Sequence, residues 1–416
     1  MSERPAPARI DDYADPQFSP EVGEILSMMA PMAEGVRLEP DALCEAASAE
    51  TGLHDFGDDG FRPSLEVLCA ALRTEAGLGA VGRFMVHQQL VGLLKNRLLI
   101  ADVLRRHPEI HDVVIDRPII IAGLPRTGTT HLHNLMSADP ALRSLPYWES
   151  LEPVLAESEQ PAAGEPDPRR ARTEQGLALL DAAMPLFKRM HEMTVDHVHE
   201  EIQLLAIDFS TMLFETVALI PTWRDWYMAH DQTPAYEYMK TVLKVLQWLR
   251  GGDRWVLKSP QHLEQFGPLV YTFPDATFVV THRDPVAVTT SLVTMMSYTA
   301  RLNVEHPDPV RIGRYWSARV EEMLYACVRD RELLPADRSI DVPFDEFMAD
   351  DVAMVERIYS VAGQPMTDTS RKAMDDFMAD HPRGRHGTVV YDLGDFGLDP
   401  EERRQALAGY AARFGV

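Results

Sequence analysis

The chain has 416 residues and a formal net charge of −24 at pH 7. This length allows one large domain, or roughly two or three smaller ones, with a substantial hydrophobic core. The acidic balance argues against non-specific binding to nucleic acid or to an anionic membrane surface. Three cysteines, with neither metal-ligand spacing nor a paired framework, fit a reducing compartment: Cys44, Cys69 and Cys327.

Targeting segments are not visible in the sequence. No apolar run approaches the ~18 residues expected of a membrane span. The first residues also lack the apolar segment of a secretory signal. We therefore expect a soluble cytoplasmic protein that has no membrane span and no nucleic-acid partner.

The N-terminal quarter of the chain is patterned as helix. From residue 20 to about residue 107, apolar side chains recur at a helical period. We predict that residues 1–110 form a helical region that packs on a core domain of residues 111–416.

A glycine-rich stretch after residue 118 organises the rest of the chain. Residues 119–122 form a short, continuously apolar run, typical of a strand buried on both faces of a parallel sheet. Gly123 and Gly128 then predict a tight turn, and apolar residues recur at helical spacing from Thr129. The free N–H groups at such a helix start bind anions. The pattern is that of a nucleotide phosphate loop in which Thr129 replaces the usual lysine.

A long insertion follows this loop. Residues 156–172 are rich in Glu, Pro, Ala and Arg without periodicity, which predicts an exposed loop. Residues 174–250 return to a helical pattern crowded with Met, Phe, Tyr and Trp. Such an apolar stripe usually packs in the hydrophobic core and binds no ligand. Its place between two predicted strands also allows a helical cap around a hydrophobic acceptor cavity.

Three more short strands alternate with helices in the C-terminal half. They are predicted at Trp255–Lys258, Ala276–Thr281 and Ser339–Val342. This alternation predicts parallel βαβ units, whose ligands bind at the carboxyl ends of the strands. Three cations lie just past predicted strand ends, on one rim of the sheet: Arg126, Lys258 and Arg283.

The chemistry of this rim differs from that of ordinary ATP enzymes. The phosphate loop lacks its lysine, and the strand at Ala276–Thr281 is followed by His282 and Arg283 where a Mg²⁺-binding Asp would be expected. Such a site suits a nucleotide whose transferred group carries less charge than a triphosphate.

Two motifs resemble those of the PAPS-dependent sulfotransferases, which use 3′-phosphoadenylyl sulfate as donor. Their 5′-phosphosulfate loop is similar to the stretch Pro125-Arg-Thr-Gly-Thr-Thr130. Their 3′-phosphate motif, an Arg at a strand end and a Ser eight residues later, is matched by Arg283 and Ser291. A third, C-terminal motif is matched only partly by residues 382–387, which keep the glycine spacing and Arg383 but lose the first Arg.

The resemblance, which covers the chain from about residue 118 onward, implies a role for each matching residue. The 5′-phosphosulfate is expected on Pro125, Arg126, Thr127, Gly128, Thr129 and Thr130. The 3′-phosphate, which distinguishes this donor from ATP, is expected on Arg283 and Ser291. A C-terminal segment of about residues 380–398 is expected to cover the cofactor through Arg383, Gly384 and Arg385.

Sulfonate transfer needs a positioned base and a cation at the leaving oxygen. By similarity to tyrosylprotein-type enzymes, Lys258 is predicted to face the bridging oxygen, with Arg126 binding the phosphosulfate. The base is predicted to be Glu149, about twenty residues after the loop. The alternatives are histidines from other regions: His197, His199 and His262.

We therefore predict a three-layer α/β fold of P-loop type, with a short parallel sheet flanked by helices, a helical N-terminal region and a helical cap. The resemblance implies transfer of a sulfonate from PAPS to a hydroxyl, or an amine, of a small or lipid-like acceptor. The product is 3′,5′-ADP, and no metal is expected. The alternatives are a small-molecule kinase on the same scaffold and a catalytically silent nucleotide-binding protein.

Overall fold

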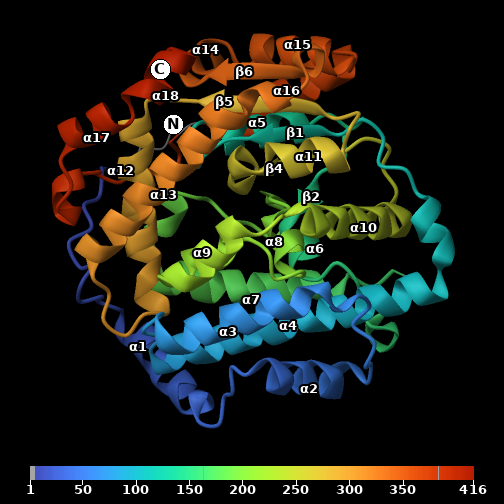
Figure 1. Cartoon of the computed structure of the whole chain (residues 1–416), viewed down its shortest axis with the longest axis vertical. Coiled ribbons are helices and arrows are strands. Elements are labelled where there is room, and N and C mark those ends of the chain that lie inside the picture. Colours follow the sequence, from blue (N-terminus) through green and yellow to red (C-terminus); the bar gives the residue numbers. More distant parts are fainter. Residues whose placement is uncertain (1–4, 163, 383) are drawn as a thin grey trace.

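A four-stranded parallel sheet lies at the centre of the C-terminal part of the chain (Figure 1). The computed structural model describes residues 5–162, 164–382 and 384–416. The strand order is β4-β1-β5-β6. The strands are β1 (Ile119–Ala122), β4 (Val256–Ser259), β5 (Thr277–His282) and β6 (Ser339–Pro343). All four sequence-predicted strands are therefore present, within one residue of their expected bounds.

The register of the sheet brings the carboxyl ends of three strands to one edge. Ile119 on β1 lies opposite Val256 on β4 and Thr277 on β5, and the pairing stays parallel throughout. Each residue of β1, β4 and β5 is buried, which explains their nearly continuous apolar sequences. The loops that follow these strands consequently meet at a single rim.

Helices cover both faces of the sheet, so the predicted three-layer α/β fold is confirmed. One face packs on α5 (Thr129–Ser137), α14 (Phe344–Ala349), α15 (Asp351–Ala362) and α16 (Asp368–Asp380). The other packs on a larger core that includes α10 (Thr233–Arg250), α12 (Pro285–Thr299) and α13 (Pro309–Asp330). In Figure 1, α14 and α15 lie beside β6 at the top of the molecule.

The N-terminal helices lie at the opposite end of the molecule from α14 to α16 (Figure 1). They are α1 (Pro20–Met29), α2 (Pro40–Thr51), α3 (Arg62–Thr74) and α4 (Ala80–Arg106). Helix α3 packs on α9 (Pro221–Ala229), and α4 packs on α2 and α10. In the described part of the chain, no helix combines the length and the apolar character needed to cross a membrane.

Two features between β1 and β4 differ from the sequence prediction. Helix α7 (Pro168–Ala183) begins within the predicted loop of residues 156–172, because the Asp167 carboxylate caps it at the Arg169 N–H. A two-residue strand, β2 (Leu145–Pro146), pairs antiparallel with β3 (Val198–His199). This short ribbon was not predicted, and it turns the segment after α7 toward the rim of the sheet.

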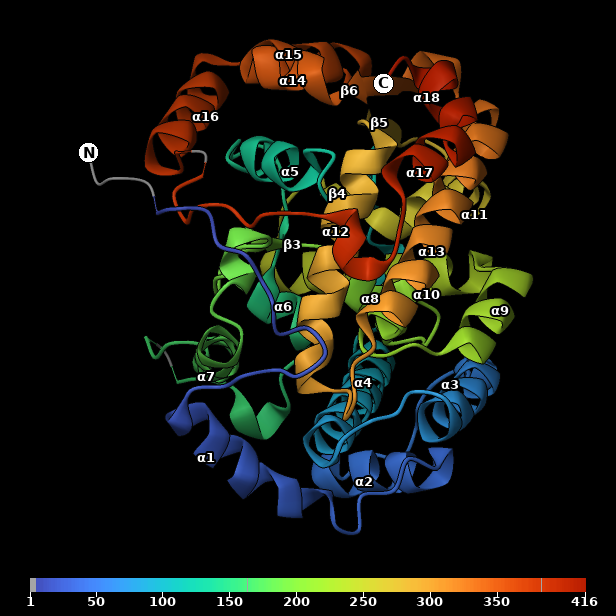
Figure 2. The same cartoon turned by 90° about the vertical axis from the view of Figure 1, so that its left-hand side faces the viewer.

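Segments near both ends of the chain run side by side next to this segment (Figure 2). Ala8 pairs in parallel with Val389. The Arg189 guanidinium donates hydrogen bonds to the carbonyls of Ala6 (2.8 Å) and Thr388 (3.2 Å). Helices α17 (Pro400–Ala406) and α18 (Ala408–Phe414) follow.

Candidate functional site

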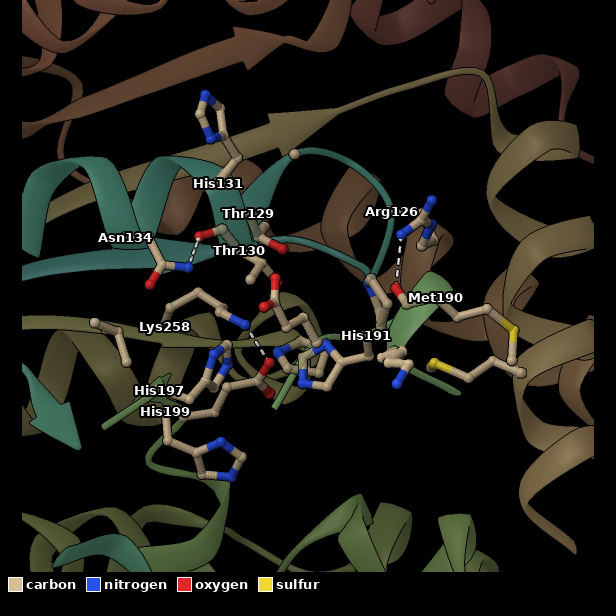
Figure 3. Close-up of a pocket in the computed structure, with 18 of the residues that line it drawn as sticks. Arg126, Thr129, Thr130, His131, Asn134, Met190, His191, His197, His199 and Lys258 are labelled. Carbon is tan, nitrogen blue, oxygen red and sulfur yellow. Dashed lines mark hydrogen bonds and ion pairs between the residues drawn. The ribbon is translucent and has the colours of Figure 1, made fainter. Parts of the chain in front are cut away.

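A cavity of about 880 Å³ opens at the carboxyl-end rim of the sheet (Figure 3). Its walls come from the glycine loop after β1, the start of α5, the end of β4, helices α12 and α13, and residues 384–387. The opposite wall is formed by residues 187–200, which we call the histidine segment. Figure 3 shows Lys258, Arg126 and the histidines of this segment arranged around the same space.

The glycine loop has little room for side chains. A Cβ atom on Gly123 would lie 1.9 Å from Thr281 Oγ1, and Gly128 adopts a left-handed φ of +88° immediately before α5. Arg126 also has a positive φ, +74°, although it is not glycine. The loop therefore holds a strained backbone that turns the N-terminus of α5 toward the cavity, as an anion site requires.

The threonines of the loop divide into a structural one and two that line the cavity. Thr127 is buried, and its hydroxyl is bonded to the Leu124 carbonyl (2.7 Å) and Thr281 Oγ1 (2.6 Å). Thr129 and Thr130, by contrast, line the cavity together with Pro125. Thr127 thus fixes the loop to β5, while its neighbours face the ligand space.

Two arginines of the rim are connected through the loop backbone. Arg283 Nη1 donates to the Arg126 carbonyl at 2.6 Å, and Arg126 Nη1 donates to the Met190 carbonyl at 2.8 Å. Burial, followed by the charge of Arg126, lowers the pKa of Arg283. Arg126 Nε is buried without a partner among the described residues. Both cations consequently have capacity for an anionic ligand.

Ser291 lies on α12, two turns beyond Arg283. Its side chain is 4% exposed, and its hydroxyl has no hydrogen-bond partner in the described part of the chain. It does not itself line the cavity. A buried hydroxyl without a partner is costly, and an anion held by Arg283 would supply one.

Lys258 is the penultimate residue of β4, and its side chain, only 2% exposed, lies at the wall of the cavity. Its ammonium group forms an ion pair with Glu200, which also lines the cavity. The Lys258 backbone N–H donates to Glu201 Oε2 at 2.9 Å. Two neighbouring glutamates thus bind one lysine. Glu200 pairs with the Lys258 ammonium group, and Glu201 accepts a hydrogen bond from the Lys258 backbone N–H.

His262, one of the predicted base candidates, belongs to a buried network behind this lysine. Its Nε2 lies 2.6 Å from Glu201 Oε1, and its Nδ1 lies 2.9 Å from the Tyr236 hydroxyl. It is fully buried and does not line the cavity. Its geometry is that of a residue that orients Glu201.

Three histidines of the histidine segment line the cavity: His191, His197 and His199. The ring centroid of His197 lies 5.3 Å from that of His191 and 5.9 Å from that of His199. Burial, followed by the charges of nearby groups including Lys258, lowers the pKa of the first to about 3 and of the second to about 2. For the third, burial and its histidine neighbours hold the pKa well below the usual range. All three are therefore neutral at physiological pH.

Glu149 is not placed where the sequence predicted. It lies on α6 (Tyr147–Leu151), and its carboxylate pairs with Arg143 (3.1 Å) and Arg250 (3.0 Å). It lines a separate cavity of about 350 Å³ beside Arg250, and not the one that contains Lys258. Glu149 therefore lies apart from Lys258, and two arginines neutralise its carboxylate, a placement that does not favour its predicted role as the base.

The C-terminal segment contributes residues 384–387 to the wall of the cavity. Gly384, with a φ of +72°, and Arg385 line it. The Arg385 guanidinium and His386 Nε2 both contact Glu192 of the histidine segment. Arg383, the third predicted residue, lies outside the described residues.

Much of the remaining cavity wall is apolar. Flexible or large hydrophobic side chains come from Met190, from residues 212–213, and from α12 and α13, which contribute Leu292, Met295, Met296, Trp316 and Met323. A second cavity of about 180 Å³ shares Met296, Trp316 and Thr216 with the first. The apolar space therefore continues beyond the main cavity.

Sequence reasoning missed His191 and Glu200 as lining residues. Both lie in a stretch that was interpreted as continuous helix, where the side chains of neighbouring residues diverge. The signal that could have located them is the concentration of His and Glu in residues 191–201, which is unusual for the face of a buried helix.

Comparisons with known proteins agree on one family. Residues 118–368 match the model of the Sulfotransferase family. The crystal structure of sulfotransferase STF1 from Mycobacterium tuberculosis is 31% identical, with a TM-score of 0.79 over 90% of this chain and 99% of that one. STF9 from Mycobacterium avium is 29% identical, with a TM-score of 0.81 over 91% and 97%. The omega-hydroxy-beta-dihydromenaquinone-9 sulfotransferase Stf3 of M. tuberculosis is 23% identical over 70% of this chain and 72% of its own length.

Proposed function

The chain belongs to the sulfotransferase family, and we propose that it transfers a sulfonate group from PAPS to a hydroxyl, or an amine, of a lipid-like acceptor. One observation carries the proposal. The glycine loop, Arg126 and Arg283 line a single cavity that also has an extensive apolar wall, and Met296 and Trp316 of that wall border a second cavity. An anionic donor and a hydrophobic acceptor can therefore occupy it together.

The described residues fit a donor with two separated phosphate-type groups. The loop backbone, the N-terminus of α5 and the hydroxyls of Thr129 and Thr130 suit the 5′-phosphosulfate. Arg126 offers its unpaired Nε to the same group. Arg283 and the unpaired Ser291 hydroxyl suit the 3′-phosphate, and Gly384 and Arg385 approach from the C-terminal segment.

PAPS, when bound, supplies an activated sulfonate group and 3′,5′-ADP as the leaving group. The role of Lys258 is electrostatic, because its buried ammonium group balances the negative charge that develops on the leaving oxygen. The proton of the acceptor must be taken by a side chain that lines the cavity. Glu149 and His262 do not line the cavity, whereas His197, His199 and Glu200, at the end of the histidine segment, do.

The apolar walls support a lipid-like acceptor. Methionine side chains adapt to irregular apolar ligands, and several of them lie between the histidines and the second cavity. The relative Stf3 is named for an omega-hydroxy dihydromenaquinone acceptor. An acceptor with a reactive hydroxyl at one end and a hydrocarbon body would place both parts in matching surroundings.

Calorimetry with 3′,5′-ADP, ADP and AMP tests the donor assignment. We expect 3′,5′-ADP to bind at least ~10-fold more tightly than ADP, and Arg283→Ala to abolish that preference, since a charge-assisted phosphate contact contributes about 1.5–3 kcal/mol. Arg329→Ala is the matched control, because Arg329 is exposed on α13 and pairs with Asp330. Equal binding of 3′,5′-ADP and ADP to the wild type would overturn the proposal.

A further inference from the structure

Three carboxylates line the large cavity among the described residues: Glu192, Asp196 and Glu200. Glu192 contacts Arg385 and His386 of the C-terminal segment. Asp196 makes a two-point ion pair with Arg170, at 2.5 Å for each oxygen, and its side chain is 62% exposed. Glu200 differs from both, because its partner is the buried ammonium group of Lys258.

The histidines beside Glu200 are poor proton acceptors in this position. Burial and the surrounding positive charge hold the pKa of His191 at about 3 and that of His197 at about 2. A general base works best when its pKa lies near the working pH. The Lys258 ammonium group instead holds an anionic carboxylate, Glu200, at the same wall of the cavity.

We propose that Glu200 is the general base of the reaction, and that Lys258 holds it in a paired, resting state until the donor binds. This inference rests on the proposed function, since it assumes that Lys258 faces the leaving oxygen. With the donor present, the ammonium group has a second anion to contact. Its ion pair with Glu200 then loosens, and the carboxylate becomes available to the acceptor beside it.

The proton and electron movements balance without another reactant. Glu200 takes the proton of the acceptor hydroxyl while the hydroxyl oxygen forms its bond to sulfur. The bond between sulfur and the bridging oxygen breaks, and its electron pair stays on 3′,5′-ADP, next to Lys258. The carboxylate and ammonium groups thus act on opposite ends of one displacement.

Glu201 is a positioning residue in this arrangement. Its two oxygens are taken by the Lys258 backbone N–H at 2.9 Å and by His262 Nε2 at 2.6 Å, and it is fully buried. It fixes the end of β4 relative to β3, which keeps the side chains of Lys258 and Glu200 within contact. The two adjacent glutamates therefore have separate tasks.

The test compares two acceptors that differ in their need for a base. An aliphatic alcohol must lose its proton to a base, whereas p-nitrophenol is already largely ionised at about pH 8, where both rates are measured. We expect Glu200→Gln to lower kcat with a long-chain alcohol by ~10²-fold or more, and with p-nitrophenol by less than ~5-fold. Glu50→Gln is the matched control, because it removes the carboxylate of an exposed glutamate–lysine pair outside the cavity, Glu50 with Lys95 at 2.8 Å, and it should change neither rate by more than ~3-fold.

Equal losses with both acceptors would overturn the proposal, because they would make Glu200 only a positioning partner of Lys258. Binding of 3′,5′-ADP to the wild type and to Glu200→Gln separates this outcome from failure of the proposed function, which would show as no selective binding to the wild type. If Glu200→Gln does not fold, Glu200→Asp replaces it. That variant keeps the carboxylate, so a larger loss for the alcohol than for the phenol supports the proposal and equal losses overturn it.

Discussion

The two walls of the cavity are built in opposite ways. The rim of the sheet consists of short, fully buried strands, and its two arginines contact backbone carbonyls, with Arg283 also lying over the Phe344 ring at 4.0 Å. The histidine segment is irregular, and both ring nitrogens of His199 lack partners among the described residues. Under the proposed function, the wall built from regular strands would bind the donor, and the irregular wall would bind the acceptor and receive its proton.

The largest expected effect concerns the rim. Lys258→Ala should lower kcat by ~10³-fold with both an alcohol and p-nitrophenol, because charge on the leaving oxygen is then unbalanced whichever acceptor attacks. Single-turnover transfer measures the change. Lys372→Ala, on the exposed face of α16, is the control. A loss confined to the alcohol would assign Lys258 to the acceptor wall instead.

Glu149→Gln tests a carboxylate that belongs to neither wall of the cavity. Loss of its charge leaves Arg143 and Arg250 without their shared carboxylate, and we expect the free energy of unfolding to fall by about 3 kcal/mol. Urea unfolding measures it. The kcat of the folded variant should stay within ~3-fold of the wild type. A ~10²-fold loss of kcat at unchanged stability would return Glu149 to the role expected from its sequence position.

The low pKa values of the histidines that line the cavity predict how the free energy of unfolding depends on pH. Folding keeps the pKa of His191 at about 3, so between pH 6.5 and 3 the unfolded chain binds a proton that the folded chain does not. The free energy of unfolding is therefore unaffected by His191 above pH 6.5, and it falls as the pH is lowered, by about 2 kcal/mol at pH 5.

His191→Gln should therefore reduce the difference in unfolding free energy between pH 7 and pH 5 by about 2 kcal/mol. Urea unfolding at the two pH values measures it. His54→Gln, on the exposed surface, is the control and should leave the difference unchanged. If His191→Gln behaves like the control, the histidine segment is more accessible to solvent than the structure shows.

The smallest expected effect concerns the apolar end. Met296→Trp places a larger side chain where the main cavity meets the second one, so the KM of a long-chain alcohol should rise ~10-fold. A short-chain alcohol and 3′,5′-ADP should bind as before. Met28→Trp, on the exposed side of α1, is the control. Equal changes for short and long alcohols would mean that the acceptor does not extend past α12.

The rim was predictable because its signals are local. The apolar run of β1, the paired glycines and the start of α5 at Thr129 follow from neighbouring residues, as do the cations after β4 and β5. Their use in donor binding stays a prediction. The sequence could not show that Arg143 and Arg250 neutralise Glu149, since these partners lie 6 and 101 residues away.

The acceptor wall escaped prediction for a related reason. Strands β2 and β3 have two residues each, which is too short for any alternating pattern to appear. Without the ribbon, residues 174–250 had no visible interruption that would turn His199 and Glu200 toward Lys258. The meeting of Glu200 with Lys258 depends on contacts between distant segments, and only the folded chain reveals it.

The pairing of Ala8 with Val389 has a practical consequence for the wall of the cavity. Arg189 and Gly387 line the ligand space, and Arg189 donates hydrogen bonds to the carbonyls of Ala6 and Thr388. A truncation that removes Ala6 and Ala8 would therefore remove contacts that hold this part of the wall, although both residues lie far along the sequence from Lys258 and Glu200. An affinity tag is better fused behind α18, which lies away from this contact (Figure 2).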